Sequence, residues 1–122
     1  MLDAKTGVVA GTIALGHKAG IGVDGTKPEA AGLAVSPDGK RLLVANYQNE
    51  SVSLIDTAGH KVVAETDLRP GVIDPAKSGQ PGGTYPNLVA FVSDEKAYAA
   101  SQRDRELITL EVHPTGLAVT GR

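Results

Sequence analysis

The chain of 122 residues contains no cysteine and no tryptophan, and its aromatic residues are three tyrosines and one phenylalanine. Without cysteine it can form neither disulfide bonds nor zinc sites built from thiolates, and cysteine usage gives no indication of its compartment. No apolar run approaches the roughly 18 residues that a membrane-spanning helix requires, so we expect no membrane span.

An excess of basic residues is also missing, because 12 lysines and arginines stand against 14 aspartates and glutamates. The resulting net charge of -2 argues against nucleic acid or an anionic membrane as the main partner, since both attract a basic surface. The length favours a single domain with a modest core.

The N-terminal stretch "MLDAKTGVVAG" lacks the basic segment and apolar run of a signal peptide. It opens on Leu2-Asp3, which resembles the end of a strand. We therefore expect the chain to be a fragment whose natural start lies upstream. An intracellular protein is the alternative explanation for the missing signal.

What the sequence does contain is an internal repeat. With a shift of 55 positions, residues 33–56 lie without gaps on residues 88–111, and Leu33 falls on Leu88. The stretch "VVAGT" from Val8 also recurs as "VVAET" from Val62. Apolar or small residues coincide at Leu42/Ala97, Leu43/Tyr98, Val44/Ala99, Val52/Leu107 and Ile55/Leu110. This periodicity indicates a fold built from repeated units.

Each repeat is predicted to hold four short strands, which in the first complete unit are Gly32–Ser36, Arg41–Asn46, Ser51–Asp56 and Lys61–Leu68. The turn Pro37-Asp38-Gly39 combines a fixed φ, a side chain that hydrogen-bonds the backbone, and a glycine that accepts positive φ. The continuous apolar run of the second strand indicates that both of its faces are covered.

Helices are not expected, because 15 glycines and 7 prolines interrupt most windows long enough to form one. A single helical turn near Glu29–Ala31 is the exception. The connections Gly16–Ala31 and Arg69–Pro86 are predicted as long loops, which in compact domains are usually functional or disordered.

The predicted fold class is all-β: a partial β-propeller of about two and a half four-stranded antiparallel blades, formed as one unit by residues 1–122. Residues 1–16 would end one blade, 32–68 would form a full blade, and 87–122 a second blade, complete or incomplete. A closed ring takes roughly 4–8 blades, so the others would come from the same protein or from other copies of the chain.

The repeat resembles the YVTN-repeat, or YncE-like, family of β-propellers. Its blade motif matches Leu33–Thr57 and Lys61–Ala64, although the name-giving Tyr-Val-Thr-Asn reads Leu43-Val44-Ala45-Asn46 here. The second unit is similar to a subgroup in which a propeller precedes an alkaline-phosphatase-like phosphoesterase domain. The shared features are "LRPG…DP…SG…GG…YP", within Leu68–Pro86, and the turn "SQRDRE", Ser101–Glu106. The resemblance implies an exported bacterial protein in a periplasmic or extracellular setting.

The sequence contains only weak motifs for cofactor binding, metal binding or catalysis. Residues 20–25 fit G-x-G-x-x-G, but no helical pattern follows them, so we interpret them as a loop rather than a dinucleotide site. Metal-ligand spacing is missing around the histidines, which we place at the surface: His17, His60 and His113. A nucleophile-elbow context is missing around Ser36, Ser78 and Ser101. We therefore assign no catalytic, cofactor-binding or metal-binding residue.

Residues that could contact a partner are Tyr47, Tyr85, Arg103, Asp104 and Arg105. Tyrosine joins an apolar ring to a polar tip, and arginine forms a fork for carboxylate or phosphate. The alternative is that the tyrosines cover blade ends, and that the alternating charges of residues 103–106 form a solvated turn whose charges pair with one another.

The expected function is a non-catalytic binding or scaffold module for an unknown protein or small molecule. The alternatives are an accessory propeller of a phosphoesterase, a lactonase-like hydrolase, and a protein whose copies assemble to close a ring.

Overall fold

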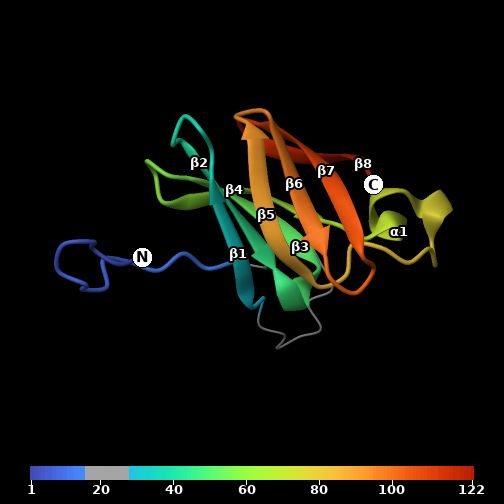
Figure 1. Ribbon diagram of the computed structural model, residues 1–122, viewed down its shortest axis with the longest axis horizontal. Helices are drawn as coiled ribbons and strands as arrows, with labels where there is room; N and C mark the ends of the chain where they lie inside the picture. Colours follow the sequence, from blue (N-terminus) through green and yellow to red (C-terminus); the bar gives the residue numbers. More distant parts are fainter. Residues whose placement is uncertain (16–27) are drawn as a thin grey trace.

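Figure 1 shows the computed structural model, which describes residues 1–15 and 28–122 and contains two four-stranded antiparallel sheets. The first sheet has the order β1-β2-β3-β4, with strands Ala30–Val35, Arg41–Asn46, Ser51–Asp56 and Lys61–Asp67. The second has the order β5-β6-β7-β8, with strands Pro86–Ser93, Lys96–Ser101, Glu106–His113 and Gly116–Gly121. The predicted all-β class and the four-stranded antiparallel units are confirmed.

Short helical turns occur only in the connections of the described part: η1 (Tyr47–Asn49), α1 (Pro70–Ile73) and η2 (Pro75–Lys77). Proline starts both α1 and η2, where its fixed φ suits the first helical position and its missing N–H costs nothing. The connection 69–86, predicted as a plain loop, therefore has structure of its own.

The predicted bounds of β2 and β3 are confirmed, β1 ends at Val35 rather than Ser36, and β4 ends at Asp67 rather than Leu68. β1 begins at Ala30, so the helical turn predicted at Glu29–Ala31 is wrong. Glu29 has a left-handed backbone, with φ of 49°, and its carbonyl accepts a hydrogen bond from the amide of Tyr47. This hydrogen bond ties the residue before β1 to the first residue after β2, and the chain enters the sheet directly.

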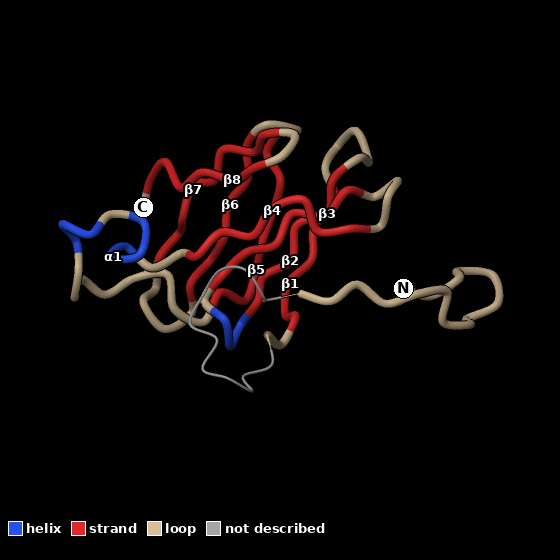
Figure 2. The backbone as a smooth tube through the Cα atoms, turned by 180° about the vertical axis from the view of Figure 1, so that it is seen from behind, coloured by secondary structure: helices blue, strands red, loops and turns tan. Residues whose placement is uncertain are grey.

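The core lies between the two sheets, which stack face to face (Figure 2). Fully buried residues from the first sheet are Leu43, Ala45, Val52 and Leu54, and those from the second are Ala97, Ala99, Ile108 and Leu110. β6 contributes the alanines Ala97 and Ala99 to this cluster, which leaves room for larger side chains from the facing sheet. Residues of β2 from Leu43 to Asn46 are all buried, which confirms that this strand is covered on both faces.

The strands β1 and β5 approach one another closely at Gly32. A Cβ atom at this position would lie 2.6 Å from the carbonyl oxygen of Asn87, which is closer than real contacts allow. Glycine is therefore required here for the backbones to meet.

The repeat is present in the structure, but the predicted pairing of Leu33 with Leu88 is wrong. Leu33 lies opposite Val44, whereas the counterpart of Val44, Ala99, lies opposite Val89. The first strands therefore correspond at a shift of 56 and the remaining strands at 55. The second hairpin is shorter by one residue at its tip, so the shift leaves the strands on their proper faces.

Residues 1–15 extend away from the sheets (Figure 1). Their one strand-like feature is an isolated bridge between Leu2 and Val9, and the turn within it is held by hydrogen bonds from the amides of Lys5 and Thr6 to the carboxylate of Asp3. The assignment of residues 1–16 to the end of a blade stays a prediction.

We predict that Leu54→Ala lowers the free energy of unfolding by about 2–5 kcal/mol, because it removes a fully buried side chain from the contact between the sheets. Leu2→Ala is the matched control, since Leu2 is exposed and its truncation should change stability by less than about 0.5 kcal/mol. Urea unfolding followed by circular dichroism measures both. Equal effects would contradict the assigned core.

Candidate functional site

The loop ends of the sheets bring together Tyr47, Tyr85 and Arg103, three of the residues predicted as partner contacts. The two tyrosine rings stack with their centroids 4.9 Å apart and their planes at 25°. The guanidinium carbon of Arg103 lies 6.0 Å from the centroid of the Tyr85 ring, within cation–π range. Both tyrosines are half-buried and Arg103 is exposed, so the cluster presents a charge beside an aromatic platform.

The turn that places Tyr85 is a feature of the repeat. Tyr85 has φ of 52° and corresponds to Glu29, which has φ of 49°. The carbonyl of Tyr85 accepts a hydrogen bond from the amide of Gln102, as Glu29 does from Tyr47. A second pair of equivalent positions behaves in the same way, Glu50 at 54° and Arg105 at 55°. The left-handed backbone at these positions is therefore common to both repeats. What differs is the side chain, because Glu29 stands in the first repeat where Tyr85 stands in the second.

A groove of about 510 Å³ lies beside the cluster, between the 69–84 segment and the β6–β7 turn. This volume is within the range of small-molecule sites, roughly 300–1,000 Å³. Side chains with hydrogen-bond donors line the groove: Arg69, Ser78, Gln80 and Arg103. Arg103 belongs both to this lining and to the tyrosine cluster, so the groove could hold a ligand whose acceptor groups reach Arg103.

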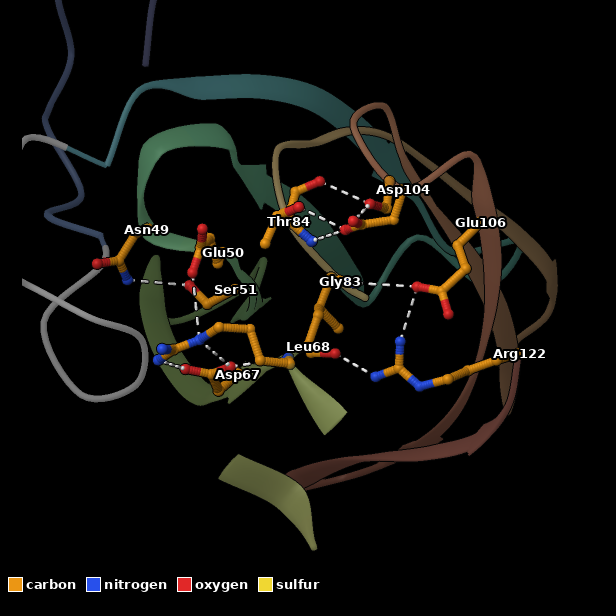
Figure 3. Close-up of polar contacts among 12 residues, drawn as sticks. Asn49, Glu50, Ser51, Asp67, Leu68, Gly83, Thr84, Asp104, Glu106 and Arg122 are labelled. Atoms are coloured by element: carbon orange, nitrogen blue, oxygen red, sulfur yellow. Dashed lines mark hydrogen bonds and ion pairs between the residues drawn. The ribbon is translucent and has the colours of Figure 1, made fainter. Parts of the chain in front are cut away.

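The two arginines of the groove differ in how they are paired. Arg69 is held by Asp67, at 2.5 Å, and by Glu50, at 3.2 Å (Figure 3). Burial raises the pKa of the Glu50 carboxyl, although Arg69 acts in the opposite direction. Arg103 forms no ion pair with any residue that the structure describes, so it is the cation available to a ligand.

Asp104 holds the turn together from within. Its carboxylate accepts hydrogen bonds from the amide and hydroxyl of Thr84, the former at 2.8 Å, and from the hydroxyl of Ser101 at 3.1 Å (Figure 3). Burial acts to raise the pKa of Asp104, but these hydrogen bonds outweigh it and the net effect lowers the pKa. Asp104 thus fixes the backbone before Tyr85, and its contact with a partner stays a prediction.

The 68–84 segment is fastened to the second sheet by a second polar group. Arg122 pairs with Glu106 at 2.8 Å and donates to the carbonyl of Leu68. Glu106 also accepts a hydrogen bond from the amide of Gly83 at 2.9 Å (Figure 3). Gly83 has φ of 73°, and a Cβ there would collide with the carbonyl group of Leu68. One edge of the groove is thereby fixed in place.

The predicted self-pairing of the charges at residues 103–106 is wrong, because Glu106 pairs with Arg122 and Asp104 binds Thr84 and Ser101. Arg105 is exposed and forms no ion pair in the described part of the chain. Sequence reasoning did not select Arg69, Thr84, Gly83, Glu106 or Arg122 as site residues. Most of them lie in the two motifs that carried the family resemblance, which was the available signal.

Other sequence motifs lie away from this cluster. His60 and His113 are exposed, as predicted. His17 and the G-x-G-x-x-G stretch of residues 20–25 fall outside the described residues. Across residues 1–15 and 28–122, no group of three or more histidine, aspartate or glutamate side chains could hold a metal ion. None of the helices described there is long and apolar enough to cross a bilayer.

No family model and no curated protein matches the sequence. Among solved structures, the chain is similar to KlHsv2 with loop 6CD replaced by a Gly-Ser linker, a propeller-containing protein, with 15% identity and a TM-score of 0.55. The match covers 77% of this chain and 30% of that one. Hydrazine synthase of Kuenenia stuttgartiensis matches at 17% identity and a TM-score of 0.36, over 80% of this chain and 38% of that one. The chain thus spans about a third of the structures it matches, and its two sheets are consistent with a β-propeller-like fold.

We predict that Gly83→Ala destabilises the chain more than Gly79→Ala does. Both glycines have positive φ, which costs an alanine about 1–2 kcal/mol, but only Gly83 also lacks space for a Cβ. The free energy of unfolding in urea, measured for both variants, checks this. Equal losses would show that the segment is not held against Leu68.

A second prediction concerns pH. Because folding lowers the pKa of Asp104 below its ordinary value of 3.8, its contribution to stability is present above that pH and is lost as the pH falls through the folded pKa. Asp104→Asn should therefore lower the free energy of unfolding at neutral pH. Acidification should then lower this free energy by less in the variant than in the unmodified chain. Thr84→Val should raise the pKa of Asp104, which NMR titration of the carboxyl carbon measures. An Asp104 pKa above 3.8 in the unmodified chain would contradict this account.

Proposed function

We propose that the chain is a non-catalytic binding module whose ligand site is the groove beside Tyr47, Tyr85 and Arg103. The observation that carries the proposal is the stacked tyrosine pair beside an exposed guanidinium, that of Arg103, which also lines the groove and forms no ion pair with the described residues. Asp104 holds the turn before Tyr85 and Arg122 holds one edge of the groove, so the site is organised before a ligand arrives.

The chemistry of the groove favours a ligand that joins a planar group to an acidic group. A planar group can lie against the tyrosine rings, and a carboxylate or phosphate can take the guanidinium of Arg103. The hydroxyl of Ser78 lines the same groove and can donate to a further oxygen, whereas the Thr84 hydroxyl already donates to Asp104. The ligand would be a small molecule of this kind or the same groups on a protein partner.

The number of blades, the type of repeat and the origin of the chain are also proposals. We propose that the chain is a partial propeller of about two and a half blades of the YVTN type, from an exported bacterial protein. The blade motif supports this, as does the way the two sheets repeat one another.

We predict that phenyl phosphate, which joins a ring to a phosphate, shifts the amide NMR resonances of Tyr47, Tyr85 and Arg103. Arg103→Ala should weaken this binding by about 10-fold or more, because it removes a charge-assisted hydrogen bond. Tyr85→Ala should weaken it as well.

Lys96→Ala is the matched control, because Lys96 lies 5.6 Å from the ring centroid of Tyr98 in a second cation–π pair outside the groove. This variant should bind phenyl phosphate as the unmodified chain does. Equal losses in the Arg103 and Lys96 variants, or no shifts at the groove, would contradict the proposed site.

A further inference from the structure

The second sheet carries an exposed apolar face on the side away from the first sheet. We call it the outer face, and it consists of Leu88, Ala90, Tyr98, Ala100, Leu107 and Thr109, which share one side in the strand register. Leu88 is 63% exposed and Leu107 is 57% exposed. Large aliphatic side chains grouped on one open sheet face indicate a surface made to be covered.

The chain contains the same surface a second time, and there it is covered. The counterparts of the outer face in the first sheet are Gly32, Ala34, Leu43, Ala45, Val52 and Leu54. Those residues pack against Ala97, Ala99, Ile108 and Leu110 of the second sheet. The structure thus shows which kind of surface covers such a face, namely the opposite face of a sheet of the same repeat.

The first sheet exposes part of that opposite face at β1. Leu33 and Val35 lie on the side away from the second sheet and are 62% and 59% exposed. Their counterparts in the second sheet, Val89 and Phe91, face the first sheet and contribute to the core. One chain therefore carries the outer face and, at β1, the open part of the face that would cover it, while Val44 and Ile55 on the same side are already buried.

We infer that copies of this chain associate head to tail, with the outer face of one copy docking on the β1 side of the next. The contact repeats the stacking between the two sheets, with Leu107 and Leu88 of one copy placed against Leu33 and Val35 of the other. Because the two surfaces differ, the arrangement is heterologous, and it grows into a ring or an open chain. It does not depend on the ligand groove, which lies at the loop ends.

The test is sedimentation velocity of the full chain over about 10 μM to 1 mM, which brackets the dissociation constants expected of a modest interface. The unmodified chain should associate as its concentration rises. Leu107→Glu and Leu33→Glu should each weaken association by at least about 10-fold, since each buries a charge in the contact. Val8→Glu, which alters an exposed residue of the N-terminal segment, should leave association unchanged.

Mixing the two variants is the decisive step. The Leu107→Glu variant keeps an intact β1 side and the Leu33→Glu variant keeps an intact outer face, so an equimolar mixture should restore a 1:1 complex. Circular dichroism and urea midpoints close to those of the unmodified chain show that each variant is folded, and Tyr98→Glu replaces Leu107→Glu if that variant is not. An unmodified chain that stays monomeric, a symmetric dimer sensitive to Leu107→Glu alone, or a mixture without a complex would overturn the inference.

Discussion

The rest of the structure depends on the burial of aliphatic side chains between two sheets. Leu43, Val52 and Leu54 of the first sheet belong to one buried cluster with the alanines of β6 and the larger residues of β7. Each sheet alone would leave this face in water, and a single four-stranded sheet has no second layer to bury it. The contact therefore holds both sheets and sets the separation of their loop ends, on which the geometry of the tyrosine cluster depends.

The loop ends are organised by hydrogen bonds rather than by packing. In each sheet the carbonyl before the first strand accepts an amide from the second turn, and in the second sheet Asp104 adds three further bonds. Ser101 is buried, which strengthens its bond to Asp104 because water competes less for the donor. The result is a fixed turn that presents Tyr85, while its repeat counterpart presents Glu29 with the same backbone.

The sequence predicted much of the fold because its signals were local. The Pro-Asp-Gly turn, the apolar run of β2 and the 55-residue repeat each depend on neighbouring residues, and the strands of the first sheet followed from them. The pairing of Leu33 with Leu88 failed for a different reason. An ungapped alignment cannot detect one residue lost at a hairpin tip when both alternatives place an aliphatic residue in the strand.

The candidate site was predicted in part for the same physical reason. Tyr47, Tyr85 and Arg103 stood out by residue type, and the fold brings them together. The roles of Arg122, Gly83 and Thr84 arise from contacts between residues far apart in the chain, such as that of Arg122 with Leu68. No local sequence pattern encodes such a contact. The alternating charges of residues 103–106 likewise do not reveal that Glu106 pairs with Arg122 rather than with its neighbours in the sequence.

The unequal hairpins have a consequence for how this architecture can vary. Residues 36–41 separate Val35 from Leu42, whereas only residues 92–96 separate the corresponding Phe91 from Ala97. A change in chain length is thus absorbed at the tip, and the inward and outward sides of both strands are preserved. These tips are accordingly the places where evolution or an engineer can graft foreign segments while the stacked interior keeps its register.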